Sequence, residues 1–332
     1  MEEKKTRKWR FGKNRWLVLL FILLGIWLAG VYPPIQPHVQ LPAENVSHEP
    51  LFSLPMIGDF YLTNTMVAMI LVDIIVITAA IVVRNTVKKM EKTNELAPKG
   101  LAGVVEAIMS YLYDMTESTA GKWAKTIFPF FFCIFFVVLI ANWMELIPGV
   151  DSIGILHASE HGNPVQQILP GVYAVIKGEA EHGEWYGMIP FVRVLSTDLN
   201  FTVGLALISV VMIQVIGLRS QGVKYFSKFW NTKGFFSKPI FGLIDWAVGL
   251  LEIVSEISKI LSFAFRLFGN IFAGSVMLFV IGALVPVIAQ SAFLGLEFFV
   301  GAIQAIVFGM LTMIFMAQAT MGHGDHGEHA EE

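Results

Sequence analysis

Charged residues and cysteines are both scarce in this sequence. Only 15% of its 332 residues are Asp, Glu, Lys or Arg, while 55% are hydrophobic. Because soluble domains carry about 25% charged residues, this composition indicates a protein whose solvent is lipid. The net charge of -3 is too small to indicate a nucleic-acid or polyanionic partner. The single cysteine, Cys133, excludes a disulfide and a cysteine-based metal site within one chain.

Recognisable catalytic and nucleotide-binding motifs are also missing. The sequence has no HExxH, GxSxG or Walker A pattern. Its eight histidines fall in predicted loops or in the C-terminal tail, where His323, His326 and His329 lie in a polar, solvated segment. We therefore predict that this chain carries no catalytic centre, nucleotide site, cofactor or resident metal.

Long apolar runs are abundant instead, and a spanning helix needs about 20 such residues. The runs are residues 16–32, 65–83, 127–147, 201–218, 241–286 and 287–320. The last two would be about 68 and 50 Å long as helices, against a hydrocarbon core of about 30 Å. We predict an all-α polytopic membrane protein with about six transmembrane helices. The last two should be long and strongly tilted, and residues 241–286 should form one helix rather than a hairpin.

Basic residues alternate between the connections. They crowd the N-terminal segment and residues 84–126 and 219–238, are absent from residues 32–64, and number only two in residues 148–200. By the positive-inside rule this pattern places both termini on the inner, cytoplasmic side of the membrane.

The sequence divides into three parts. Residues 1–33 are either a retained signal-anchor helix or a cleaved signal peptide; cleavage would leave five spans and an external N-terminus. Residues 34–320 form the membrane domain, with an amphipathic helix predicted at 101–124 on the inner surface and no fold specified for the outer loop at 151–190. Residues 321–332 are a His- and Glu-rich tail expected to be disordered.

Polar residues form two stripes on the last two helices. On a helical wheel, one narrow face of the first helix carries Glu252, Glu256, Lys259, Arg266 and Asn270, with Ser262 beside it. In the last helix Gln290, Glu297 and Gln304 recur every seven residues and so share a face. Ionisable residues within spans are costly, which makes these two faces a predicted ion path.

Arg266 is the most informative of these residues. It lies about 20 residues from either end of its apolar segment, so its side chain cannot reach bulk water by snorkelling. A guanidinium stays charged at any physiological pH and must face a counter-charge or a hydrated cavity. Glu252, Glu256, Glu297 or a carboxylate on another subunit could serve. A structural pair with Glu297 is the plainer interpretation, and Glu252 and Glu256 could instead mark the inner membrane interface; we favour an ion path.

The segment around Arg266 resembles a known family. Residues 262–274, Ser-Phe-Ala-Phe-Arg-Leu-Phe-Gly-Asn-Ile-Phe-Ala-Gly, are similar to the signature of subunit a of the F-type rotary ATP synthase. Residues 142–149, 196–202 and 304–305 resemble further segments of that family, and the similarity extends roughly from residue 55 to the end. Where many relatives carry an acid or a histidine this chain has Ser275, and Glu297 stands where others have histidine.

The resemblance implies a stator subunit without a catalytic centre of its own. Its two long helices would embrace a ring of c subunits, and Arg266 would face the ring carboxylates and separate two half-channels. Asn270, Glu297 and Gln304 would line the outer half-channel, and Glu252 with Ser262 the inner one. Ser275 and Glu256 are also predicted to lie on the proton path. Peripheral-stalk b subunits and the rest of the synthase would be partners. The residues alone also fit a self-contained ion-coupled secondary transporter or channel with an arginine-gated cavity.

Overall fold

The computed structural model describes most of the chain. The described residues are 14–31, 42–47, 49–55, 58–93, 100–147, 150–176, 185–229, 239–285 and 287–321. Most of the predicted tail and parts of the predicted N-terminal segment lie outside these residues. The alternative between an anchor and a signal peptide therefore stays a prediction.

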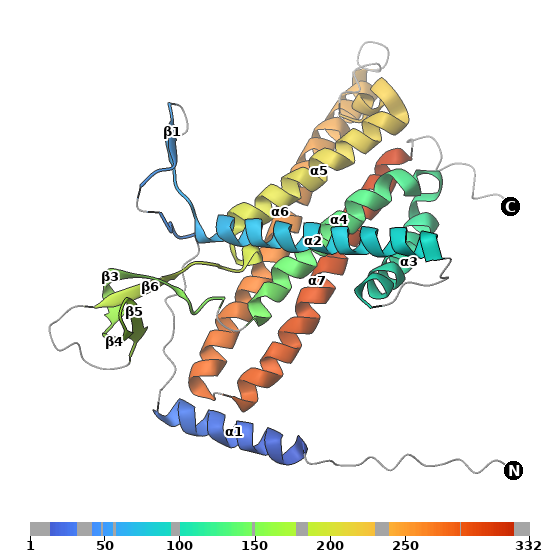
Figure 1. Cartoon of the computed structure of the whole chain (residues 1–332). Helices are drawn as coiled ribbons and strands as arrows, with labels where there is room; N and C mark the ends of the chain where they lie inside the picture. The colour runs from blue at the N-terminus through green and yellow to red at the C-terminus, as the bar shows by residue number, and fades with distance from the viewer. Residues whose placement is uncertain are drawn as a thin grey trace, which may run out of the picture. The chain divides into compact units, whose positions relative to one another are not determined.

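Seven α-helices make up most of the described structure (Figure 1). They are α1 (Asn14–Val31), α2 (Asn64–Thr93), α3 (Leu101–Ala120), α4 (Ala124–Trp143), α5 (Leu199–Gln221), α6 (Pro239–Leu284) and α7 (Ile288–Thr320). Among the described residues, five helical segments are long and apolar enough to cross a membrane, with α3 and α4 counted as one and α1 offering only a shorter apolar stretch. The all-α polytopic fold predicted from the sequence is confirmed.

The two C-terminal helices are continuous, as predicted. α6 contains 46 residues and α7 contains 33. At 1.5 Å per residue α6 is about 69 Å long, so residues 241–286 do not form a hairpin. A short turn follows α6, in which Val287 adopts a φ of 74°. The predicted amphipathic helix is also present, although α3 ends at Ala120 and a 3₁₀ turn, η1 (Gly121–Trp123), leads into α4.

The chain forms two compact units. The smaller comprises Met1–Val39, Leu156–Met188 and Gly274–Glu297, and the larger comprises Gln40–Ile155, Ile189–Ala273 and Phe298–Glu332. The chain therefore passes from the larger to the smaller unit within α6 and returns within α7. Each unit is considered by itself below.

The core of the larger unit is apolar and drawn from α3, α4, α5, α6 and α7. Its fully buried members include Phe131, Ile213, Leu267 and Phe308. Gly309 permits close approach, because a Cβ added there would lie 2.8 Å from the Phe131 ring. Small residues at such contacts are typical of helices that pack in membranes, where lipid gives no hydrophobic drive for association.

Buried hydrogen bonds join the ends of several helices in the larger unit. Asn142 donates from Nδ2 to the Gly301 carbonyl (3.1 Å) and accepts from Ser196 Oγ (2.6 Å). Asp198 caps α5 by accepting from the Asn200 N–H (2.9 Å), and its other oxygen accepts from Thr65 Oγ1 (2.9 Å). Two of the segments that resemble the known family, residues 142–149 and 196–202, thus contribute to helix packing.

Short strands occupy the connections. β1 (Phe52–Leu54) pairs with β2 (Gly58–Phe60), β3 (Gly154–Asn163) with β6 (Tyr186–Pro190), and β4 (Val165–Leu169) with β5 (Val172–Val175). The β4–β5 hairpin is antiparallel and turns at Gly171, whose φ of 81° suits glycine. For residues 151–190 the sequence specified no fold, so these strands are an addition to the predicted structure.

Candidate functional site

Arg266 lies on α6 in the larger unit and is partly exposed. Its Nη2 donates a hydrogen bond to Ser262 Oγ, one helical turn earlier, at 3.3 Å. Among the described residues of the larger unit no ion pair joins Arg266 to an acid; the pairs there hold Glu252 and Glu256 to lysines. Within this unit the guanidinium is therefore positioned by a neutral hydroxyl.

One turn further along α6, an amide pair connects the last two helices. Asn270 donates from Nδ2 to Gln304 Oε1 on α7, at 2.9 Å. Gln304 is buried, whereas Asn270 is exposed. The Gln304 Nε2 donor has no hydrogen-bond partner among the described residues. The structure thus brings together two of the predicted path residues on neighbouring helices.

This pair leads to an asymmetric stability prediction. Asn270→Leu would leave the buried Oε1 of Gln304 without its hydrogen-bond donor, at a cost of about 1–3 kcal/mol. Gln304→Leu, the matched change, removes the buried polar group altogether and leaves only the exposed Asn270, so it should cost less. The midpoint of thermal unfolding of each solubilised variant measures the difference. A greater loss for Gln304→Leu would contradict this account.

Glu297 occupies a tight place in the smaller unit, against Gly274. Glu297 is only 6% exposed, and its Oε2 has no hydrogen-bond partner among the described residues. A Cβ added at Gly274 would overlap the Glu297 carboxylate, so the missing side chain makes the space that this carboxylate fills. Ser275 is the neighbouring buried residue. Glu297 and Ser275 therefore belong to the smaller unit, whereas Asn270 and Gln304 belong to the larger one. That all four lie on one path stays a prediction.

The remaining predicted acids, Glu252 and Glu256, form ion pairs in the larger unit. Lys228 Nζ lies 2.5 Å from Glu252 Oε1 and 3.2 Å from Glu256 Oε1. Lys259 Nζ lies 2.8 Å from the same oxygen of Glu256. Two acids and two lysines make this acid–lysine cluster (Lys228, Glu252, Glu256 and Lys259) neutral overall.

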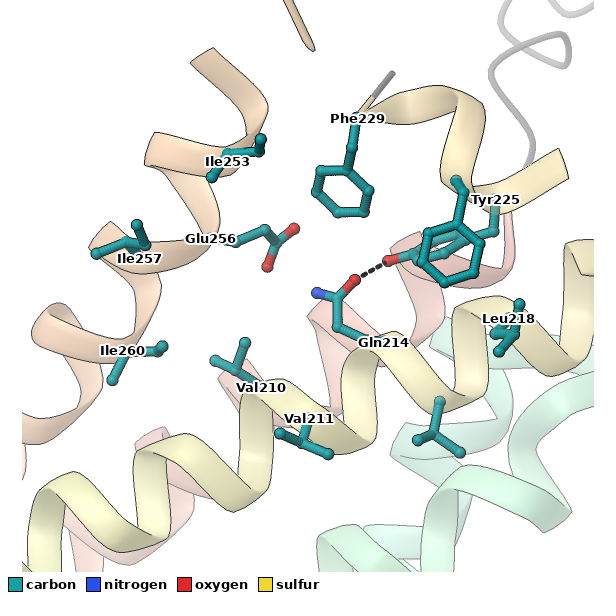
Figure 2. A pocket seen from close by; sticks show the side chains of 12 residues that line it. Val210, Val211, Gln214, Leu218, Tyr225, Phe229, Ile253, Glu256, Ile257 and Ile260 are labelled. Atoms are coloured by element: carbon teal, nitrogen blue, oxygen red, sulfur yellow. Dashed lines mark hydrogen bonds between the residues drawn. The ribbon is translucent and has the colours of Figure 1, made fainter. Parts of the chain in front are cut away.

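A cavity of about 390 Å³ borders this cluster between α5, the 3₁₀ helix η4 (Gly222–Lys228) and α6. Figure 2 shows Glu256 pointing into the space between these elements, with Gln214 and Tyr225 opposite. The Tyr225 hydroxyl donates to Gln214 Oε1 at 2.8 Å. Gln214 Nε2 and Glu256 Oε2 are buried and have no hydrogen-bond partner among the described residues. The walls of the cavity are otherwise aliphatic and aromatic.

Several residues of these sites were not predicted from the sequence. Lys228 looked like an ordinary basic residue of an inner connection, and its distance of 24 residues from Glu252 carries no helical periodicity. Gly274 belongs to the signature segment, but no role was assigned to it. Gln214 could have been identified from the sequence, because an amide in the middle of an apolar span is uncommon.

The described residues contain no group of three or more His, Cys, Asp or Glu side chains placed to hold a metal ion. The histidines of residues 322–332 lie outside the described residues.

Long apolar helices that carry a cation, amides and acids at membrane depth define a multi-pass membrane protein equipped to handle ions. A family model described as "ATP synthase A chain" matches residues 66–317, so the chain belongs to the ATP synthase A chain family. It is accordingly a membrane subunit of the proton-translocating ATP synthase, takes part in ATP synthesis and ion transport, and associates with the rest of that complex.

Curated relatives carry the name ATP synthase subunit a. The protein of Mycobacterium ulcerans is 28% identical over 271 residues, covering 80% of this chain and 89% of the relative. The protein of Campylobacter jejuni strain 81-176 is 28% identical over 258 residues, covering 77% and 90%. The protein of Gluconacetobacter diazotrophicus is 26% identical over 240 residues, covering 68% and 77%.

Proposed function

We propose that this chain forms two half-channels that carry protons to and from the carboxylates of a rotating c-ring, with Arg266 separating them. The observation that supports this proposal is the environment of Arg266. A permanent cation lies within a long apolar helix, and its one hydrogen bond in the larger unit's described residues goes to the neutral Ser262. Such a cation requires a counter-charge, and a ring carboxylate would supply one from outside the chain.

In the proposed mechanism, protonation lets a ring carboxyl travel through lipid. A bare carboxylate at the bilayer centre would cost several kcal/mol, whereas a protonated one crosses more cheaply. When the carboxyl returns to this chain, the charge of Arg266 favours its ionised form and so releases the proton. The membrane potential contributes about 2.3 kcal/mol for each charge per 100 mV.

We assign the path residues to the two half-channels by their positions. Asn270, Gln304, Glu297 and Ser275 would line the outer half-channel, and Glu252, Glu256 and Ser262 the inner one. The alternation of basic connections supports this direction, because Glu252 lies toward the basic, inner end of α6. The exposed position of Asn270 and the buried position of Gln304 suit a relay from a ring surface into the protein.

The proposed partners are the c-ring and peripheral-stalk b subunits, in a bacterial plasma membrane with both termini cytoplasmic. Large apolar surfaces remain available on α2, whose exposed residues include Ile70, Ile74 and Ile77. Such exposed aliphatic faces suit lipid or the helices of other subunits.

Copurification tests this proposal. When the chain is isolated in mild detergent, small helical-hairpin subunits and the ATP-hydrolysing subunits should copurify with it and be identified by mass spectrometry. The chain purified alone and placed in vesicles should carry no ion-coupled transport. Coupled transport by the isolated polypeptide would instead assign it to the class of self-contained transporters with an arginine-gated cavity.

A further inference from the structure

The 3₁₀ helix η4 fits between α5 and α6 because two glycines make room for it. A Cβ at Gly217 on α5 would overlap the ring of Tyr225, and a Cβ at Gly249 on α6 would lie 2.6 Å from the Phe229 carbonyl oxygen. Gly222, with a φ of 63°, ends α5 and turns the chain into η4. These contacts, all within the larger unit, fix the end of η4 against α6.

This arrangement places Lys228, the last residue of η4, beside both acids of α6. Its Nζ is within ion-pair distance of Glu252 (2.5 Å) and Glu256 (3.2 Å). The same nitrogen lies 5.5 Å from the centre of the Phe229 ring and 5.8 Å from that of Tyr225. Lys228 is thus held by charge and by two aromatic faces.

The two acids differ in what surrounds them. Glu256 Oε1 accepts from both Lys228 and Lys259, and the Glu256 side chain is 10% exposed. Glu252 forms an ion pair with Lys228 and keeps 27% of its side chain exposed. Glu256 is therefore the more buried acid of the cluster, and Glu252 is the more exposed one.

We propose that Lys228 is a positioning residue that holds Glu252 in its ionised form at the inner end of the proton path, so that protons pass this carboxylate without being retained. This inference rests on the proposed function, because it assigns Lys228 a role in the proposed inner half-channel. With Lys228 present, two positive and two negative charges cancel. Without it, the cluster would carry one net negative charge and attract protons.

Among the described residues, the charged or titratable groups in contact with the acid–lysine cluster contribute to this balance. Lys228 and Tyr225 come from η4, and Lys259 from α6 itself. α5 contributes the uncharged Gln214, to which Tyr225 donates (Figure 2), and α7 contributes the Phe315 ring 4.8 Å from Lys259 Nζ. Lys228 is thus the basic residue that η4 contributes to the cluster.

The environment of Lys228 favours the protonated, charged form of its side chain. Burial alone would lower the pKa of its ammonium group, but the hydrogen bond that it donates to Glu252 and the charges of Glu256, Tyr225 and Glu252 raise that pKa above its ordinary value. A raised lysine pKa means that the ammonium stays charged throughout the neutral range, so Lys228 acts as a fixed charge.

The test is the pH dependence of ATP-driven proton pumping in inverted membrane vesicles, where the inner side faces the bath. Lys228→Gln should raise the bath pH at which pumping is half-maximal by about 0.5–1 unit, since the loss of a partly exposed neighbouring cation favours proton binding. Glu252→Gln should shift the same midpoint in the opposite direction, because the carboxylate that collects protons is then missing. Lys228→Arg keeps the charge and should shift the midpoint less than half as far as Lys228→Gln.

Lys122→Gln is the matched control. It removes an exposed lysine from η1, another basic connection of the predicted inner side, and should leave the midpoint unchanged. A midpoint for Lys228→Gln that coincides with the unmodified complex overturns the inference. Should that variant fail to assemble, Glu252→Gln decides alone, and an unshifted midpoint again overturns it. Arg266→Ala, measured in the same membranes, tests the proposed function separately. If it abolishes pumping while the midpoint of the Lys228 or Glu252 variant is unshifted, the role of Lys228 is rejected and the proposed function stands.

Discussion

Arg266→Ala is expected to abolish coupled, ATP-driven proton pumping. If Arg266 is the counter-charge for a ring carboxylate, its removal leaves that carboxylate ionised and unpaired at membrane depth. Breaking a buried pair by removing one partner costs about 3–5 kcal/mol, which corresponds to a loss of about 100-fold or more in rate. Pumping is measured by quenching of a pH-sensitive dye in inverted vesicles, with ATP hydrolysis recorded in parallel.

The proposed role of Arg266 in separating two half-channels leads to a second prediction for Arg266→Ala. Passive proton flow through the membrane sector should persist or increase, because no fixed cation remains between the two paths. Arg266→Lys should also lose most pumping, since an ammonium lacks the planar fork of the guanidinium. Arg219→Ala, which removes an exposed arginine from the last turn of α5, serves as the matched control and should pump normally. Unchanged pumping by Arg266→Ala would reject the proposed function.

The sequence predicted the helices well because apolar length is a direct property of the chain. Residues 241–286 were expected to form one helix, and α6 is continuous over Pro239–Leu284. The pairing of Asn270 with Gln304 follows the same logic, since each lies on a polar face that periodicity reveals. The strands of residues 154–190 were missed, because a segment rich in Gly, His and Glu lacks the alternation that predicts a strand.

Contacts between segments that are distant in the sequence could not be predicted from the sequence alone. Glu252 and Glu256 were recognised as an acidic stripe, but their partner Lys228 lies on η4, and only the approach of η4 to Gly249 brings the three together. From the sequence, Glu252 and Glu256 were weighed as markers of the inner interface, as path residues or as partners of Arg266, and were not paired with a lysine. In the structure they are ion-paired, so their charge depends on a residue that the stripe did not include.

The second large effect is expected at Gly274. Gly274→Ala should reduce ATP-driven pumping by about 10- to 100-fold, because displacement of a reacting group by about 1 Å can cost that much. The added methyl group would overlap the Glu297 carboxylate, which is the far end of a flexible side chain and can move aside. The fold should therefore persist while the carboxylate leaves its place. Pumping in inverted vesicles measures the loss, and the amount of chain in the assembled complex verifies the fold.

A compensating substitution separates this steric cause from a general loss of helix packing. Aspartate is one methylene shorter than glutamate, so Glu297→Asp withdraws the carboxylate by about 1.5 Å. In the Gly274→Ala background it should restore part of the lost pumping, although Glu297→Asp alone lowers it; such non-additivity is the mark of two groups in contact. Gly295→Ala is the matched control, because a Cβ there meets no atom within 4 Å and should leave pumping unchanged. Simple addition of the two losses in the double variant would mean that Gly274 does not act through the carboxylate of Glu297.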